Sequence, residues 1–276
     1  MSIINDGEYK LTAKLGNVKI VLQLLKAVNF KEYATFCVSA NGMKITVEEA
    51  KCMQASAYIP VQLFEEFILT EDVIFRICLD SLIETLSMLG YRLYTPDNPI
   101  LLHILYKRVG YPVGILIERN GIVVDCSLKS YDPDEILDFD LDPEAVVNKV
   151  LLQSELLKDI FAELDNSSIY LELLLSPKSP YFMISTKGTI GECHIELPHN
   201  TELIETFQCK KESKSKYLLK HMGRAMKAVP FSNKVSLRTN EAGILCFQYM
   251  IKTDNDVNCF IEYYVSPVIN DDDDDD

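Results

Sequence analysis

The most basic stretch of this acidic chain runs from Lys210 to Lys216, within 276 residues of formal net charge −14. A segment with a helical apolar period follows it at once. The residues on the face opposite the apolar stripe, in that register, are Lys216, Lys220, Arg224 and Lys227. Cations gathered on one face of an acidic protein are typical of a surface that meets a polyanion. A solvated lysine face is the alternative interpretation.

A row of carboxylates near the middle of the chain is the second group that could do chemistry, at Asp138, Asp140 and Asp142. Alternate residues of a strand lie on one side, so the three carboxylates could together hold the metal ions of a two-metal hydrolytic site. However, Pro143 follows them, an acidic segment precedes them, and no further acids complete a nuclease set. The favoured interpretation is a run of solvated acids, and we expect no metal and no cofactor.

Other catalytic patterns are missing from the sequence. There is no G-x-x-x-x-G-K-[ST] loop, G-x-S-x-G elbow or H-E-x-x-H pair, and the four histidines are dispersed. The eight cysteines are scattered without a C-x-x-C pair, so we expect reduced, mostly buried thiols in an intracellular protein. Neither an export signal nor an apolar run of about 18 residues is present, so we expect neither secretion nor a membrane span.

The elements that would position these groups follow one order in two halves of the chain. Apolar periods predict helices near residues 18–28 and 79–86 in the first half, and near 156–164 and 219–229 in the second. The first helix carries Lys19 and Lys26 on its polar face, and the third carries Lys158. Strands are expected between the helices, among them 33–40 and 43–48 around an Asn41-Gly42 turn, 122–128, 144–152, 192–197 and 203–209.

This order predicts an α+β fold with two similar domains, each an antiparallel sheet structure with two helices on one face. A segment with turn formers and acids but no apolar period separates the halves. The expected domains are residues 1–128 and 138–269, joined by a connector at 129–137. An acidic tail, 270–276, follows them.

Several blocks of the chain resemble a known family when taken together. The blocks are Asn17 to Thr35, Asn41 to Ala55, Leu137 to Asp140, Val147 to Glu155, Ser176 to Phe182, Lys234 to Thr239, Gln248 to Ile251 and Ile261 to Tyr264. They resemble the Rad-one subunits of the nine-one-one DNA-damage checkpoint clamp. This family of sliding clamps is similar to proliferating cell nuclear antigen.

The resemblance implies two clamp domains with their sheets outside and their helices lining a hole. It implies a heterotrimeric ring with two related clamp subunits, which a separate ATP-dependent clamp loader places around double-stranded DNA of any sequence. The residues that would then face DNA are Lys19, Lys26, Lys158, Lys216, Lys220, Arg224 and Lys227. The strands that would pair with the neighbouring subunits carry Ile122, Val123 and Val124 on one side and Cys193, Ile195 and Leu197 on the other.

By the same resemblance, we expect a non-enzymatic checkpoint clamp in the nucleus that recruits a checkpoint kinase activator and repair enzymes. Two alternatives stay open. One is a 3′-to-5′ DNA exonuclease, an activity described for members of the family. The other is a protein-docking scaffold that does not touch DNA. The stretch from Lys210 to Lys216 also fits a nuclear-import signal, although its place before the fourth helix favours a role facing DNA.

Overall fold

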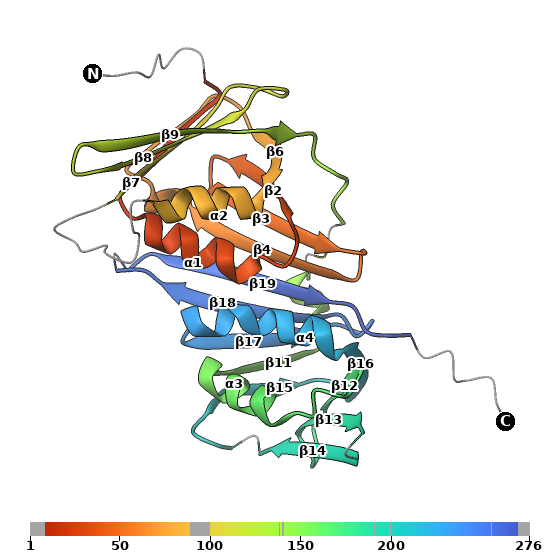
Figure 1. Ribbon diagram of the computed structural model, residues 1–276. Coiled ribbons are helices and arrows are strands. Elements are labelled where there is room, and N and C mark those ends of the chain that lie inside the picture. Colours follow the sequence, from red (N-terminus) through yellow and green to blue (C-terminus); the bar gives the residue numbers. More distant parts are fainter. Residues whose placement is uncertain are drawn as a thin grey trace. The chain divides into compact units, whose positions relative to one another are not determined.

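The structure is a computed structural model that describes residues 9–88, 100–137, 139, 141–189, 191–198, 200–254 and 256–269. These residues form two compact units. The first comprises the described residues of Met1–Glu48, Ser56–Ile136 and Lys252–Phe260, and the second those of Glu49–Ala55, Leu137–Ile251 and Ile261–Asp276. Antiparallel strands dominate and helices are few (Figure 1), which confirms the predicted α+β class.

Two sets of antiparallel strands build the first unit, in the orders β5-β1-β7-β8-β9 and β10-β6-β2-β3-β4. The strands are β1 (Leu11–Leu15), β2 (Tyr33–Ser39), β3 (Gly42–Glu49), β4 (Met53–Pro60), β5 (Glu66–Leu69), β6 (Val73–Cys78), β7 (Leu101–Tyr106), β8 (Val113–Arg119), β9 (Ile122–Leu128) and β10 (Ser130–Tyr131). A short 3-10 helix, η2 (Val61–Leu63), follows β4.

The predicted hairpin between β2 and β3 is confirmed, but its turn lies one residue earlier than expected: Ser39 pairs directly with Gly42, so Ala40 and Asn41 form the loop and Gly42 begins β3. Gly42 has a φ of +129°, which side chains rarely adopt. A Cβ atom at this position would also lie 2.2 Å from the carbonyl oxygen of Ile59. The turn therefore requires glycine both for its backbone conformation and for the close approach of β4.

Both predicted helices of the first unit are present as α1 (Val18–Val28) and α2 (Leu79–Ser87). The side chain of Asn17 caps α1 by accepting a hydrogen bond from the Lys19 N–H at 3.0 Å. The apolar stripe of α1 is buried, with Leu22 and Leu25 fully inaccessible to solvent. Burial of this stripe fixes which side of α1 carries its lysines.

The second unit contains the orders β19-β18-β17-β11-β15 and β14-β13-β12-β16. The strands are β11 (Asn148–Gln153), β12 (Tyr170–Leu175), β13 (Phe182–Gly188), β14 (Gly191–Leu197), β15 (Ile204–Cys209), β16 (Ser213–Leu218), β17 (Lys234–Thr239), β18 (Leu245–Lys252) and β19 (Asn258–Val265). The predicted helices are present as α3 (Ser154–Glu163) and α4 (Leu219–Ala225). The 3-10 helix η4 (Pro143–Ala145) precedes β11, and η5 (Met226–Phe231) continues α4.

Two elements of the second unit differ from the prediction. The strand expected at 144–152 begins only at Asn148, because Asp142 accepts a hydrogen bond from the Glu144 N–H at 2.9 Å and Pro143 opens a 3-10 turn. The helical register extended back to Lys216 is also wrong. Residues Ser213–Leu218 form β16, which pairs along its whole length with β12, so the helix begins at Leu219.

Three tyrosines, Tyr217, Tyr249 and Tyr263, are fully buried in the core of the second unit. The hydroxyl of Tyr217 donates a hydrogen bond to the Gly243 carbonyl oxygen at 2.7 Å. The rings of Tyr249 and Tyr263 meet edge to face, with centroids 6.4 Å apart. Burial raises the pKa of Tyr217 to about 12, because the phenolate form would lose its hydration.

Candidate nucleic-acid and subunit interfaces

Four of the cations predicted to face DNA are exposed on helical segments: Lys19 on α1, Lys158 on α3, Lys220 on α4 and Lys227 on η5. Lys26, in the last turn of α1, is half-buried. Exposed ammonium groups on helices can meet phosphates without reading bases. The second helix of the first unit, α2, instead carries exposed carboxylates.

Arg224 does not belong to this exposed group. Its guanidinium forms an ion pair with Glu49, and the two side chains are only 18% and 17% exposed. A half-buried pair of this kind commits the positive charge to the protein itself. We expected Arg224 to face DNA together with Lys220. The ion pair with Glu49 makes its charge less available to a ligand than that of Lys220.

Lys216 occupies a different setting from the helical lysines. It lies on β16 directly opposite Glu172 of β12, and it lines a groove of about 420 Å³. The ammonium group of Lys214, two residues earlier, pairs with Glu172 at 2.9 Å. His194 Nδ1 lies 2.8 Å from Ser185 Oγ on the same groove. The predicted row of four cations on one helix is thus split between a strand and the helical segment.

Strand β9 lies at the edge of its sheet, and among the described residues it pairs only with β8. Its predicted interface residues are apolar and accessible: Ile122 is 59% exposed and Val123 is 53% exposed, while Val124 is half-buried. Such an edge presents unpaired backbone groups beside apolar side chains, which favours pairing with another chain.

Strand β14 is the corresponding edge of the four-stranded sheet in the second unit, and in the described part of the chain it pairs only with β13. Two of its predicted interface residues, Cys193 and Ile195, are half-buried. The third, Leu197, is only 7% exposed and already belongs to the core of its own unit. The side chains available for contact at this edge are therefore fewer than at β9.

Of the three carboxylates considered as metal ligands, only Asp142 lies within the described residues. Asp138 and Asp140 lie outside the described residues, and Asp142 caps η4. Within the described ranges, no group of three histidine, cysteine, aspartate or glutamate side chains has the geometry of a metal site. The described residues also contain no helix that is long and apolar enough to cross a membrane.

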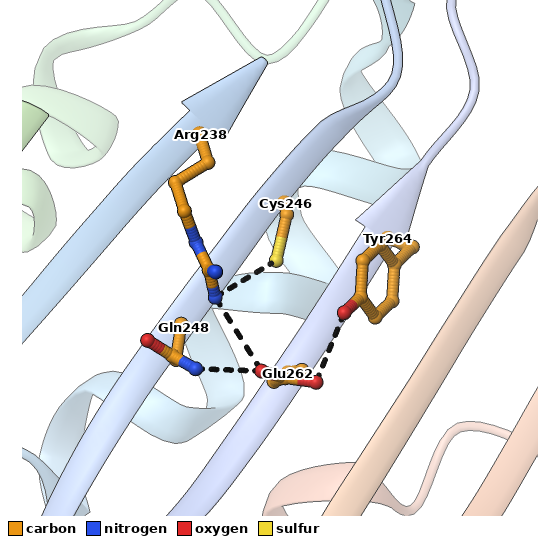
Figure 2. Close-up of polar contacts among 5 residues, drawn as sticks. All are labelled: Arg238, Cys246, Gln248, Glu262 and Tyr264. Carbon is orange, nitrogen blue, oxygen red and sulfur yellow. Dashed lines mark hydrogen bonds and ion pairs between the residues drawn. The ribbon is translucent and has the colours of Figure 1, made fainter. Parts of the chain in front are cut away.

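A buried polar network on β17, β18 and β19 was missed from the sequence (Figure 2). Glu262 accepts hydrogen bonds from Gln248 Nε2 at 2.6 Å and from the Tyr264 hydroxyl at 2.9 Å, and it pairs with Arg238 Nη2 at 3.4 Å. Arg238 Nη2 also lies 3.9 Å from Cys246 Sγ. The available signal was a glutamate within the apolar run from Ile261 to Val265, and its pairing with Arg238 follows only from the strand order β19-β18-β17.

Known proteins resemble this chain in fold class and in sequence. Mostly antiparallel sheets with few helices are consistent with a fold like that of proliferating cell nuclear antigen. A family model described as "Repair protein Rad1/Rec1/Rad17" matches residues 10–251. The chain belongs to this Rad1 family.

Named relatives agree with the family assignment. The human "Cell cycle checkpoint protein RAD1" is 40% identical over 263 residues, covering 95% of this chain and 93% of the relative. The "DNA repair protein Rad1" of Drosophila melanogaster is 28% identical over 273 residues, covering 96% and 97%. The "DNA repair exonuclease REC1" of Mycosarcoma maydis is 25% identical over 179 residues, covering only 53% of this chain and 38% of the relative.

Proposed function

We propose that this chain is a non-enzymatic subunit of a heterotrimeric clamp that encircles duplex DNA in the DNA-damage checkpoint and in repair. Membership of the Rad1 family over nearly the whole chain carries this proposal, because full-length relatives are named as checkpoint proteins. In this role the chain works in the nucleus. It depends on an ATP-driven loader, and it recruits a checkpoint kinase activator and repair enzymes.

The exposed helical lysines and the accessible edge strands support this role. A clamp must hold any sequence, so contacts with phosphates suffice, and Lys19, Lys158, Lys220 and Lys227 are suitably placed on helical segments. Head-to-tail contacts that close into a ring would cover the edges at β9 and β14. The domain limits at 1–128 and 138–269 stay part of the proposal.

Native mass spectrometry of this chain coexpressed with two related clamp subunits tests the proposal. We expect one copy of each subunit, and we expect Val123→Asp to abolish assembly because it places a charge on the β9 edge. Val109→Asp is the matched control, since Val109 is 66% exposed but lies outside the strands. A chain that stays alone, or assembly of the Val123→Asp variant at wild-type levels, would contradict the proposed ring.

The contact with DNA needs its own test, because a docking scaffold would assemble without touching DNA. For the assembled clamp, each lost phosphate contact should lower the slope of log affinity against log salt by about 0.9. Lys220→Ala should therefore lower this slope without changing assembly. Absence of binding to duplex DNA by the assembled complex would favour the scaffold.

Exonuclease activity remains a second candidate because one partial relative carries that name. The assay is digestion of 3′-labelled duplex DNA by the purified chain with Mg²⁺, comparing wild type with Asp142→Asn. We expect no digestion that depends on Asp142, since its carboxylate is engaged in capping η4. Loss of an observed activity in the variant would support the nuclease instead.

A further inference from the structure

A row of polar side chains crosses three neighbouring strands of the second unit. Gln208 on β15 and Arg238 on β17 both lie directly opposite Lys149 on β11. Residues paired in this way point to the same face of a sheet. They line a hollow of about 230 Å³, together with Lys210 and residues of the segment from Pro143 to Val147. This hollow lies outside both the helical lysines and the edge strands described above.

The charge of the hollow is unbalanced. Its lining contains Lys149, Lys210 and Arg238 but no carboxylate, and because Arg238 is paired with Glu262 behind the lining, the uncompensated charge is that of the two lysines. Like charges directly opposite one another on neighbouring strands are destabilising, and Lys149 faces Arg238 in this way. Lys149 is exposed, and its ammonium group forms no ion pair with the described residues. Lys210 Nζ donates a hydrogen bond to the Val146 carbonyl oxygen at 2.9 Å, which holds this third cation at the hollow.

The polar network in Figure 2 holds the guanidinium of Arg238 in its orientation. Its Nη2 atom faces Glu262, whose carboxylate is also satisfied by Gln248 and by Tyr264. Its Nε atom is buried, and no described residue accepts a hydrogen bond from it. Buried donors without an acceptor are rare in folded proteins. The network therefore holds the Arg238 side chain in place at the hollow, while its Nη2 charge stays paired with Glu262.

We propose that this hollow binds the phosphate group of a phosphorylated serine or threonine in a partner protein. The ammonium groups of Lys149 and Lys210 and the Gln208 amide offer donors to the oxygens of a single phosphate, beside the guanidinium of Arg238, which matches the chemistry of phosphate recognition by basic side chains. The volume of about 230 Å³ accommodates one such group.

A nucleic-acid strand fits the surroundings less well. Its phosphates repeat along the backbone, whereas these cations converge on one hollow. Exposed acids, Asp142 and Glu144, stand on either side of Pro143, which lines the hollow. A polyanion laid across the site would meet these carboxylates, whereas one phosphate on a side chain reaches the cations without extending over them. The proposal does not depend on ring formation.

The test uses the full chain, with inorganic phosphate and N-acetyl-O-phosphoserine amide as probes in calorimetric titrations at constant ionic strength. We expect both probes to bind saturably, the phosphoserine derivative at least as tightly as inorganic phosphate. Lys149→Gln should weaken both about tenfold, the size expected for one hydrogen bond between charged groups. Lys211→Gln is the matched control: Lys211 is a neighbouring exposed lysine, paired with Glu241 and not part of the lining, and we expect less than a twofold change.

Loss of folding would not explain the expected result, because Lys149 is exposed and faces a like charge. The thermal midpoint of Lys149→Gln without phosphate should equal or exceed that of wild type. Absence of saturable binding, equal weakening by the two lysine variants, or binding of inorganic phosphate alone would overturn the proposal. Displacement of the phosphoserine probe by a duplex oligonucleotide in wild type, but not in Lys149→Gln, would also overturn it, since the hollow would then belong to a nucleic-acid surface.

Discussion

The ion pair between Arg224 and Glu49 predicts that removing either partner weakens the fold of the second unit. Both groups belong to this unit, although 175 positions separate them in the sequence (224 minus 49). With exposed fractions of 18% and 17%, neither charge regains full hydration when the other is removed. Arg224→Ala would therefore leave a carboxylate in a poorly hydrated position, and Glu49→Ala would leave a guanidinium there.

The expected size follows from this burial. Removing one partner of a fully buried pair costs about 3–5 kcal/mol of unfolding free energy. Because about one sixth of each side chain remains accessible, we expect about 2–3 kcal/mol for each single alanine variant. The double variant should cost less than the sum of the single variants, by about 1–2 kcal/mol, since the second substitution removes the charge that the first left unpaired.

Urea unfolding followed by far-ultraviolet circular dichroism and by tyrosine fluorescence provides the assay, because the chain has no tryptophan. Coincidence of the two signals would show that one transition is measured. Lys220→Ala is the matched control: an exposed cation of the same helix, expected to change stability by less than about 0.5 kcal/mol. If Arg224→Ala were as mild as Lys220→Ala, or if the two alanine effects were simply additive, the pair would not stabilise the fold as argued.

Four further predictions concern stability and reactivity. Tyr217→Phe removes the hydrogen bond to the Gly243 carbonyl and should lower the unfolding free energy by about 1–1.5 kcal/mol in urea titrations; an unchanged midpoint would contradict this. Because folding raises the pKa of Tyr217 from 10 to about 12, the folded state retains a proton that the unfolded state loses, so stability should fall by up to about 1.4 kcal/mol per pH unit between pH 10 and 12. Urea titrations across this range should show a smaller fall in the phenylalanine variant, and equal falls would exclude Tyr217 as a source. Burial raises the pKa of the Cys246 thiol to about 12, so iodoacetamide at pH 8 should modify half-buried Cys193 well before Cys246, as read by peptide mass spectrometry; equal rates would show that Cys246 is accessible. Gly42→Ala should lower the thermal midpoint in a melting scan, because it places a methyl group against a backbone carbonyl at a positive φ, and an unchanged midpoint would mean that the turn can rearrange.

Helices and turns were predictable because their signals are local. The apolar period of α1 and the cap at Asn17 lie within about a dozen neighbouring residues, and the Asn41-Gly42 dipeptide indicated the hairpin, although its turn lies one residue earlier. The segment containing Lys216 shows where local signals compete. Its lysines fit the polar side of either a helix or a strand, and pairing with β12 decided the outcome.

The arrangement around charged residues was not predictable in the same way. Nothing near Arg224 in the sequence indicates that Glu49 will neutralise it. The same holds for Lys149 and Arg238, which become opposite neighbours only because β11 and β17 pair. Local composition therefore identified where positive charge is concentrated, while tertiary pairing determined which cations remain available to a ligand.

The division of the chain between its two units has a consequence for synthesis on the ribosome. The limits of the units fall inside β3, β4, β18 and β19, so the first unit includes residues Lys252–Phe260 and the second includes Glu49–Ala55. A fragment that ends at Ile136 would lack the late segment, and one that begins at Leu137 would lack Glu49, the partner of Arg224. The first unit therefore cannot be completed until nearly the entire chain has emerged, and cutting the connector does not release two self-sufficient halves.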